Sequence, residues 1–372
     1  MKILYVAGRW DPTDHNQASG IDYELYHSLL REGAEVEIVG PFKYGFSLLE
    51  RLLIKLNNRL FKKRLFKYPF LYFFKSGYHV NQAIKNTDHD LVVTKYSAPL
   101  VFANLKKPLL YICDSSVKWI EANWQSFSKF THFTMAAWES TVIKKSDQII
   151  TFSEANAKVL NKDYGAPKNS ITVFAIPASV PPDVIPETVN ERKDFKPVKL
   201  LLVGRAYHRK GVDIATEIVE ELNQRGIQAE LRIAGLEGED SRHTKFMGLY
   251  DKTIPEELEG YVANYKWAHF LLHPARFEAA GIVPSEAAAF GVPTLTNNVG
   301  GLATTVEDGV SGRVFPKDSP ADIYVSEIIK FVNDPTAYYK LSQSTKARYE
   351  RELNWPEAGK IVFRIAESLV QE

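Results

Sequence analysis

The sequence has 372 residues, of which 45% are hydrophobic and 24% are charged, and its formal net charge is +1. This length predicts two domains of about 150 to 200 residues each, and the near-neutral charge excludes a general attraction to nucleic acid. The single cysteine, Cys113, excludes an intrachain disulfide and favours a reducing compartment.

The chain opens with the strand–loop–helix–strand order of an α/β domain that has a parallel sheet. Residues 2–7 predict a short apolar strand, 21–31 predicts a helix, and 35–39 predicts the next strand. Ligands of such sheets bind beyond the carboxyl ends of the strands, so the polar loop 8–20 is a candidate cleft wall that ends at Gly20. The loop does not match the dinucleotide-binding glycine fingerprint. The alternative interpretation of Gly20 is a plain turn glycine.

Residues 42–75 are strongly basic, with nine Lys or Arg residues against one acid, Glu50. Leucines fall at helical spacing on one face of this segment: Leu49, Leu52, Leu53, Leu56 and Leu60. Basic residues spaced four apart form a row on another face: Arg51, Lys55 and Arg59. Such a helix can lie on an anionic membrane surface, and the alternative is an ordinary helix that packs on the sheet with its charges in solvent.

No apolar run reaches the roughly 18 to 20 residues that span a bilayer. The opening stretch 1–8 is too short for a signal peptide and is soon followed by Arg9 and Asp11. We therefore expect a cytoplasmic protein that is soluble, or peripheral on the inner face of the membrane through 42–75.

Two more buried strands are expected at 90–94 and 108–113. Asp114 follows the second of them, at a strand end of the kind where sheet ligands bind. Farther along, His132 lies in an aromatic stretch, and its alternative interpretation is a structural histidine. Both residues are candidates for an active site.

Residues 136–145 predict a helix and 148–152 a strand, and Ser153 is expected to cap the next helix. Farther on, a proline-rich, charged stretch with little periodicity predicts an interdomain linker at 183–198. The linker separates a first domain, 1–182, from a second, 199–354.

The second domain begins with strands expected at 199–203 and 230–234 around a helix at 212–225. Its first chemical motif is Gly204-Arg205 followed by Lys210, just beyond the first strand and just before the helix. Two cations and a helix N-terminus suit a diphosphate. The alternative interpretation is a basic surface loop.

The second motif lies in 273–301, where Glu278 and Glu286 are separated by seven residues. Between them, Gly281 precedes a helix that is expected to contain Pro284 in its first turn. A helix N-terminus after a glycine allows close approach of a phosphate. Two carboxylates beside a phosphate suit a ligand that carries hydroxyls as well, such as a nucleotide sugar. The alternative is that Glu286 only favours the helix start and that Glu278 is a solvated loop residue.

The rest of the chain predicts a helix leading into a strand, a turn and strand, and three final helices: 261–268 with 270–273, 307–315, 322–333, 336–352 and 355–370.

The segment 273–301 resembles the donor-site signature of retaining glycosyltransferases of family 4, which have the GT-B fold. The stretches VGR…KG from Val203 and E…SDQIITFSE…YG from Glu139 are similar to further family motifs. The resemblance covers nearly the whole chain and is most specific in 200–315. It implies two Rossmann-like α/β domains that face each other across a cleft, with a C-terminal helix, 355–372, that crosses back to the first domain.

The resemblance also implies roles for the residues. Glu278 would hold hydroxyls of the donor sugar and Glu286 those of the ribose. The backbone of Gly281, Ile282 and Val283 would hold the diphosphate. The donor site would be completed by two cations that neutralise the leaving group and by two glycines, one near the diphosphate and one near the base: Arg205, Lys210, Gly20 and Gly235.

The sequence departs from the family pattern at three places. Cys113 stands where relatives often have a histidine before the acidic residue, so Asp114 or His132 is left to take that role. Ala178-Ser179 replaces an Asn-Gly pair, and Ser19-Gly20 stands where many relatives have Gly-Gly.

The predicted function is transfer of a hexose from a nucleotide diphosphate sugar, first of all UDP-glucose, to a glycan or lipid-linked acceptor in polysaccharide biosynthesis. No Asp-x-Asp metal motif with a supporting role is present, so we expect neither a metal nor another cofactor. The alternatives are a nucleotide-sugar binding protein without transferase activity, or another GT-B enzyme such as an epimerase or a phosphorylase.

Overall fold

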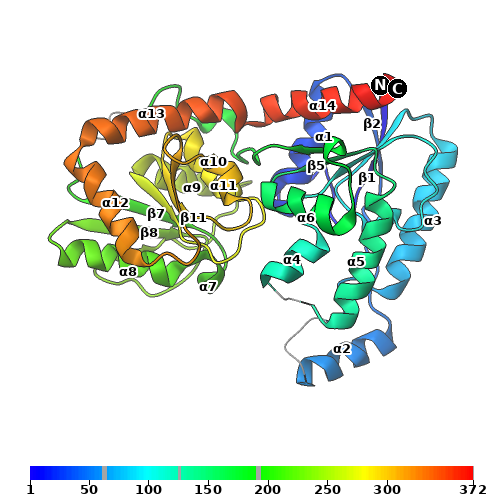
Figure 1. Cartoon of the computed structure of the whole chain (residues 1–372), viewed down its shortest axis with the longest axis horizontal. Coiled ribbons are helices and arrows are strands. Elements are labelled where there is room, and N and C mark those ends of the chain that lie inside the picture. The colour runs from blue at the N-terminus through cyan, green and yellow to red at the C-terminus, as the bar shows by residue number, and fades with distance from the viewer. Residues whose placement is uncertain (61–64, 125–126, 190–193, 372) are drawn as a thin grey trace. The chain divides into compact units, whose positions relative to one another are not determined.

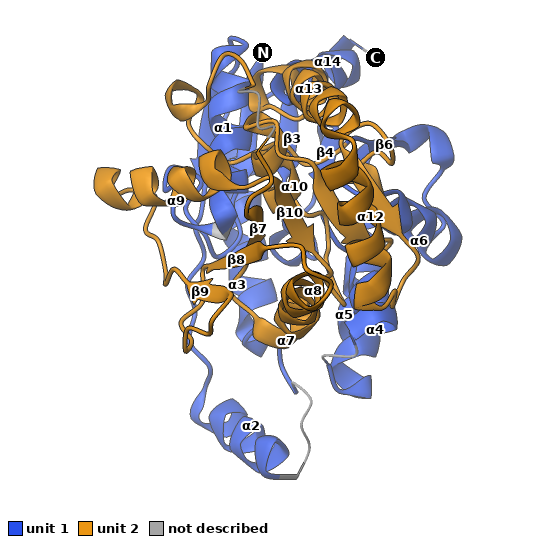
Figure 2. Cartoon of the chain, turned by 90° about the vertical axis from the view of Figure 1, so that its left-hand side faces the viewer, with its two compact units in different colours: residues 1–174, 358–372 blue, residues 175–357 orange. Residues whose placement is uncertain are grey.

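The structure of the chain is a computed structural model that describes residues 1–60, 65–124, 127–189 and 194–371. It divides the chain into two compact units, drawn in two colours in Figure 2. Unit 1 contains residues 1–174 and 358–372, and unit 2 contains 175–357. Three of the nine basic residues of segment 42–75, Lys62, Lys63 and Arg64, lie outside the described residues, as does part of the predicted linker, 190–193.

Unit 1 is built on a six-stranded parallel sheet in the order β2-β1-β3-β4-β5-β6. The strands are β1 Lys2–Val6, β2 Glu35–Val39, β3 Leu91–Thr94, β4 Leu109–Ile112, β5 Gln148–Thr151 and β6 Ile171–Val173. The helices are α1 Ile21–Arg31, α2 Leu48–Leu60, α3 Phe70–Asn86, α4 Val117–Trp124, α5 Lys129–Ile143, α6 Glu154–Tyr164 and most of α14 Trp355–Gln371.

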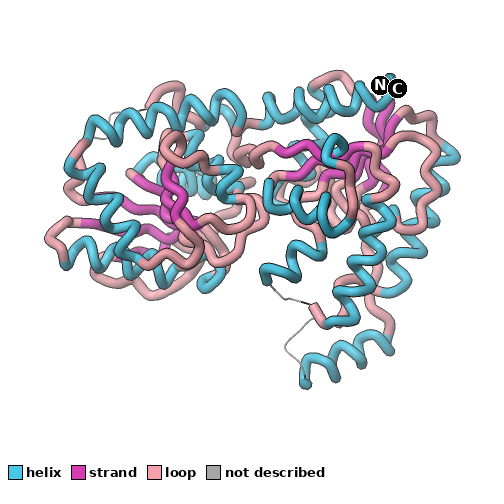
Figure 3. Tube along the Cα trace, in the orientation of Figure 1, coloured by secondary structure: helices cyan, strands magenta, loops and turns pink. Residues whose placement is uncertain are grey.

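Unit 2 has a second six-stranded parallel sheet, in the order β12-β11-β10-β7-β8-β9. Its strands are β7 Val198–Val203, β8 Ala229–Ala234, β9 Thr244–Phe246, β10 Phe270–His273, β11 Thr294–Asn297 and β12 Gly312–Phe315. Its helices are α7 Tyr207–Lys210, α8 Val212–Gln224, α9 Pro255–Trp267, α10 Ile282–Ala289, α11 Leu302–Thr305, α12 Ala321–Asn333 and α13 Pro335–Glu352. Figures 1 and 3 show that helices flank the strands in each unit.

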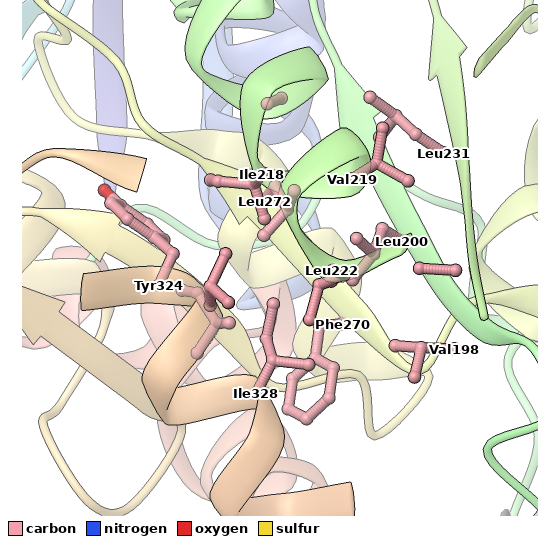
Figure 4. Close-up of a cluster of buried hydrophobic side chains, with 14 of the residues drawn as sticks. Val198, Leu200, Ile218, Val219, Leu222, Leu231, Phe270, Leu272, Tyr324 and Ile328 are labelled. Carbon is pink, nitrogen blue, oxygen red and sulfur yellow. The ribbon is translucent and has the colours of Figure 1, made fainter. Parts of the chain in front are cut away.

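The central strands of both sheets are apolar on both faces because helices cover both faces. In unit 2, α8 and α12 contribute Leu222 and Ile328 to a core that also contains Leu200 of β7 and Phe270 of β10 (Figure 4). All four side chains are fully buried. This packing fixes β7 and β10 side by side, and the candidate site is built at their carboxyl ends.

The two-domain α/β prediction is confirmed by the two parallel sheets. Two helix starts were predicted too late. The helix expected at 261–268 begins at Pro255, where a proline at the first position and acidic residues in the first turn favour a helix start. The helix expected at 136–145 begins at Lys129, because Ser128 caps it by accepting from the Thr131 N–H.

Candidate functional site

Sheet order brings the two predicted motifs of unit 2 together. Strands β7 and β10 are parallel neighbours, so the loop after each strand emerges at the same edge of the sheet. The Arg276 N–H donates to the carbonyl of Arg209 across these loops, at 2.9 Å. Arg276 also forms a two-point ion pair with Asp213 of α8, at 2.8 and 2.6 Å. The two loops are therefore held as one structure.

Lys210 and Glu278, predicted separately, form a direct ion pair between Nζ and Oε2. Arg209 Nη1 lies 3.4 Å from the same oxygen, and His273 Nε2 lies 3.3 Å from it. The side chains of Lys210 and Glu278 are 8% and 13% exposed, and His273 is fully buried. Three donors thus converge on one carboxylate oxygen. Among the described residues, none hydrogen-bonds to the other oxygen, Oε1.

The charges of this cluster fix its protonation states. Burial alone would raise the pKa of Glu278, but the ammonium of Lys210 and the hydrogen bond from His273 outweigh it and hold the pKa well below its usual range. Burial, together with the charge of Lys210, lowers the pKa of His273 from 6.5 to about 4. At neutral pH the site therefore holds an ionised Glu278 and a neutral His273. The Nδ1 atom of His273 is buried with no hydrogen-bond partner among the described residues.

Gly204 gives the Lys210 side chain its path to Glu278. A Cβ at position 204 would lie 2.6 Å from Lys210 Cγ, too close for any real contact. Lys210 itself ends the short helix α7, which the sequence did not predict. Gly235 lies beside Gly204, and a Cβ there would be 2.8 Å from the Gly204 carbonyl oxygen. These glycines mark the ends of the neighbouring strands β7 and β8.

Gly281 starts α10 in the left-handed region, with φ of 85°. A Cβ at this position would be strained and would lie 2.7 Å from Leu302 Cδ2. As the N-cap residue, Gly281 has no side chain to accept hydrogen bonds from the first amides of the helix, including those of Ile282 and Val283. The start of α10 therefore has no side-chain cap, and the binding of an anion there stays a prediction.

Glu286 lies in the second turn of α10, which starts at Ile282, and its side chain is buried. Tyr261 and Tyr265 of α9 donate to its Oε2 at 2.6 and 2.8 Å. Lys252 Nζ lies 2.6 Å from Oε1. Burial next to this carboxylate raises the pKa of both tyrosines well above 10, so they remain hydrogen-bond donors at neutral pH.

Arg205 is exposed, and its guanidinium points back to the segment 248–254, where Nη2 lies 3.5 Å from the Tyr250 carbonyl oxygen. The same segment carries Lys252, which contacts Glu286. Glu286 also acts on the pKa of Lys210, and Arg205 on that of Tyr261. Unit 2 thus gathers both predicted cations and both predicted carboxylates at one edge of its sheet.

The other predicted residues lie in unit 1. Gly20 is the N-cap of α1, with φ of 76°. Asp114 follows β4 and accepts from Ser115 Oγ at 3.3 Å. His132 lies in the first turn of α5, and its Nε2 is buried without a hydrogen-bond partner in the described part of the chain.

Sequence reasoning missed a buried acid in the same region, Asp22 of α1. It accepts from Tyr96 Oη and lies 3.8 Å from Lys95 Nζ. Asp22 and Asp114 both act on the pKa of Tyr96, which burial raises far above its ordinary value. The polar groups beyond β1, β3 and β4 therefore form a second cluster.

Several partners of the predicted carboxylates were also missed. The sequence could have indicated His273, since a histidine that ends an otherwise apolar strand is unusual. It could also have indicated Tyr261 and Tyr265 as a pair, because residues four apart in a helix lie on the same side. Lys252 lies in a stretch without periodicity, and nothing in the sequence pointed to it.

Two features are absent from the described ranges. None of the described helices is long and apolar enough to cross a bilayer. No three His, Cys, Asp or Glu side chains of the described chain are gathered as a metal ion would require.

Solved glycosyltransferase structures have the same fold. Sucrose-phosphate synthase from Thermosynechococcus elongatus is 18% identical, with a TM-score of 0.69 over 99% of this chain and 98% of that one. The Anabaena protein HepE, solved in complex with UDP, is 16% identical, with a TM-score of 0.66 over 99% and 100% of the two chains. WaaG, described as a glycosyltransferase involved in lipopolysaccharide biosynthesis, is 18% identical, with a TM-score of 0.61 over 97% and 99%. At these identities the likeness shows the GT-B fold.

Curated relatives are more similar over shorter stretches. D-inositol 3-phosphate glycosyltransferase of Nocardiopsis dassonvillei is 27% identical over 242 residues, which is 58% of this chain and 54% of the relative. Glycogen synthase of Mycobacterium tuberculosis is 29% identical over 235 residues, or 59% and 53%. The matches thus span about half the length of these relatives.

Two family models match adjoining parts of the chain. The model described as Glycosyltransferase Family 4 matches residues 23–177, and the model described as Glycosyl transferases group 1 matches 186–348. The second match contains every residue of the Lys210–Glu278 and Glu286 clusters. Together with the GT-B fold, these matches show that the chain belongs to glycosyltransferase family 4.

Proposed function

We propose that the chain transfers a hexose from a nucleotide diphosphate sugar to an acceptor hydroxyl, with retention at the anomeric carbon. The observation that carries the proposal is the convergence, at one sheet edge, of the buried Lys210–Glu278 pair with the uncapped start of α10. An ammonium and free amides suit a diphosphate, and an ionised carboxylate suits sugar hydroxyls. Few ligands other than nucleotide sugars need a cationic group and an ionised carboxylate within one small site.

Departure of the nucleoside diphosphate is the step in which negative charge develops. In the proposal, Lys210, Arg205 and the amides of Gly281, Ile282 and Val283 stabilise that charge, the electrostatic contribution that is usually the largest in catalysis. Lys210 is buried and ion-paired with Glu278. It is therefore positioned in advance and loses little freedom during the reaction.

Glu278 is proposed to bind the donor sugar through Oε1. Its Oε2 already accepts hydrogen bonds from Lys210, Arg209 and His273, and these three bonds orient the carboxylate. The low pKa of Glu278 keeps it an acceptor at neutral pH, which is what sugar hydroxyl donors require.

Glu286 is proposed to bind the ribose hydroxyls. Both tyrosine donors occupy Oε2, and Lys252 occupies one side of Oε1. Each carboxylate oxygen can accept two hydrogen bonds. A ribose hydroxyl therefore has one remaining place on Oε1, or a second if Lys252 withdraws. Gly235, at the end of β8, is proposed to leave space for the base.

The donor that we propose first is UDP-glucose, with UDP-GlcNAc and GDP-mannose as the next candidates. Support comes from the names of similar proteins: HepE was solved with UDP-glucose, and glycogen synthases are among the curated relatives. We propose a glycan or lipid-linked acceptor in polysaccharide assembly, bound with the help of Asp114 or His132, and with Gly20 near the diphosphate. No metal or other cofactor is part of this proposal, because the cations and amides meet the diphosphate charge.

We propose that the protein works in the cytoplasm, at the inner face of the membrane. The apolar face and basic row of α2 support this location.

The test is a thermal-shift screen against a panel of nucleotide sugars, followed by detection of released nucleotide with and without a glycan acceptor. We expect one donor to raise the unfolding temperature and to be turned over, and we expect Lys210→Met and Glu278→Gln each to lower turnover by about a hundredfold or more. Lys266→Met is the matched control, because Lys266 is exposed at the end of α9 that leads into β10, opposite the site. Binding without any turnover would instead show a binding protein, and no response to any nucleotide sugar would refute the proposal.

A further inference from the structure

Helix α2 has an apolar face that the protein leaves uncovered. Leu48, Leu49, Leu52, Leu53 and Leu56 are between 39% and 84% exposed. Figures 1 and 2 show α2 projecting from one end of unit 1. Single exposed leucines are ordinary, but a contiguous row of five marks a contact surface.

The leucine face is turned outward by a defined attachment. The residues of α2 that are partly shielded, Glu50, Ile54 and Asn57, lie on the opposite side of the helix. Ser47 and Glu50 form a reciprocal capping box, with hydrogen bonds of 2.7 and 3.3 Å. The other oxygen of Glu50 accepts from the Phe70 N–H at the start of α3. The helix is thus fixed at its N-terminus with its leucines pointing away.

Basic residues border the same face. Arg51, Lys55 and Arg59 are exposed and form a row along its edge. The segment 42–75 contains a single acid, Glu50, and that acid is used internally by the cap. The outward side of α2 therefore presents leucines and positively charged groups, and none of the described residues there is acidic.

A second apolar group lies nearby in unit 1. Phe130 and Phe133, at the start of α5, are 62% and 74% exposed, and Phe70, at the start of α3, is 57% exposed. Thr131 Oγ1 donates to the Leu65 carbonyl, which ties the start of α5 to the segment between α2 and α3. Both views place the start of α5 at the same end of unit 1 as α2.

We propose that α2, with the exposed phenylalanines at the starts of α3 and α5, docks on an anionic lipid bilayer. The leucines enter the boundary between headgroups and acyl chains, and the basic row binds lipid phosphates. This inference deepens the proposed function, because it names the membrane as the source of the acceptor. Docking itself does not require the transfer chemistry, so the two can be tested apart.

A second copy of the chain fits this face less well. A symmetric dimer through the leucine faces would bring two identical basic rows together without acids to neutralise them. An anionic surface satisfies the leucines and the cations at once. The choice between bilayer and dimer is therefore made by charge.

The experiment is co-sedimentation of the full chain with vesicles of phosphatidylcholine alone or mixed with phosphatidylglycerol. We expect binding to the mixed vesicles, weakened when salt is raised to about 0.5 M. The triple variant R51Q/K55Q/R59Q should bind about a hundredfold more weakly, at roughly fivefold for each charge. Leu52→Ser/Leu56→Ser should lose at least about tenfold. The matched control, Ile323→Ser/Lys340→Gln, changes an exposed apolar and an exposed basic residue of unit 2 and should bind as the wild type does.

Three results would overturn the inference. Equal binding to both kinds of vesicle would remove the charge requirement, and wild-type binding by the leucine variant would remove the apolar one. A stable dimer by light scattering that the leucine variant dissociates would assign the face to a second copy. Donor hydrolysis by the same variants separates this inference from the proposed function: it should be unchanged when docking is lost, whereas Lys210→Met should lose hydrolysis and still bind vesicles. Unfolding curves of each variant show whether it is folded.

Discussion

Replacing Lys210 by Met separates what the buried ion pair does for stability from what it does for catalysis. Methionine keeps most of the apolar stem that lies over Gly204 but removes the ammonium. Glu278, 13% exposed, then depends on Arg209 at 3.4 Å and on a neutral His273 at 3.3 Å.

The magnitude follows from this partial compensation. Removing one partner of a buried ion pair costs about 3–5 kcal/mol when the other charge is left alone. Because two weaker partners remain here, we expect Lys210→Met to reduce the free energy of unfolding by about 2–3 kcal/mol, below that range. Adding Glu278→Gln removes the stranded charge, so the double variant should recover to within about 1 kcal/mol of the wild type.

Activity should not follow stability. The single variant should lose about a hundred- to a thousandfold in kcat, the usual cost of removing one donor to a developing negative charge. The double variant should be no more active than the single variant, because neither the diphosphate nor the sugar is held. Calorimetric unfolding and initial rates of nucleotide release, measured on the same preparations, supply both quantities.

The reasoning would be refuted if the double variant were as unstable as the single one, since Glu278 would then not be the group that Lys210 neutralises. It would equally be refuted if Lys210→Met kept its rate within about threefold of the wild type, well short of the loss expected for a transition-state donor. Lys266→Met should leave both measurements unchanged.

Three further predictions concern His273, Gly281 and Glu286 of unit 2. His273 has a pKa of about 4 in place of 6.5; as pH falls from 6.5 to 4 the unfolded chain binds a proton that the folded protein does not, so stability should decline by up to about 3 kcal/mol. In urea unfolding at several pH values, His273→Gln should flatten that decline, and an unchanged slope would contradict the assignment. Gly281→Ala should lower the free energy of unfolding by roughly 1–3 kcal/mol, because φ is positive and Leu302 obstructs the Cβ. The double variant with Leu302→Ala should relieve only the steric part of that loss. An unchanged thermal midpoint for Gly281→Ala would contradict this prediction. Glu286→Gln should weaken UDP binding about ten- to a hundredfold in calorimetric titration, as for lost charged hydrogen bonds. The same substitution should have little effect on the binding of a UDP analogue that lacks both ribose hydroxyls. Equal losses for both ligands would show that Glu286 does not bind the ribose hydroxyls.

The sequence was informative where a motif coincides with a strand end or a helix start. Buried apolar runs predicted β7 and β10, and parallel sheets place such ends at one edge, so Arg205, Lys210 and the two carboxylates could be placed near one another. Gly281 was interpretable for the same reason, because a glycine before a helix permits close approach of a phosphate.

What could not be predicted depended on packing between distant segments. The burial of Glu286 follows from the side on which α9 presents Tyr261 and Tyr265, and the sequence does not contain that orientation. Lys252 reaches Glu286 only because an irregular segment passes over the sheet edge. The leucine spacing of α2 predicted an amphipathic helix, but only the structure shows that its apolar face is uncovered.

The central claim is that one site in unit 2 binds both the diphosphate and the sugar of a nucleotide sugar. The most direct test of this claim is the structure of a crystal of the protein soaked with UDP-glucose. We predict diphosphate oxygens within hydrogen-bond distance of Lys210 Nζ and the amides of Ile282 and Val283, with sugar hydroxyls on Glu278 Oε1. A nucleotide bound elsewhere, with the Lys210–Glu278 pair untouched, would contradict the claim.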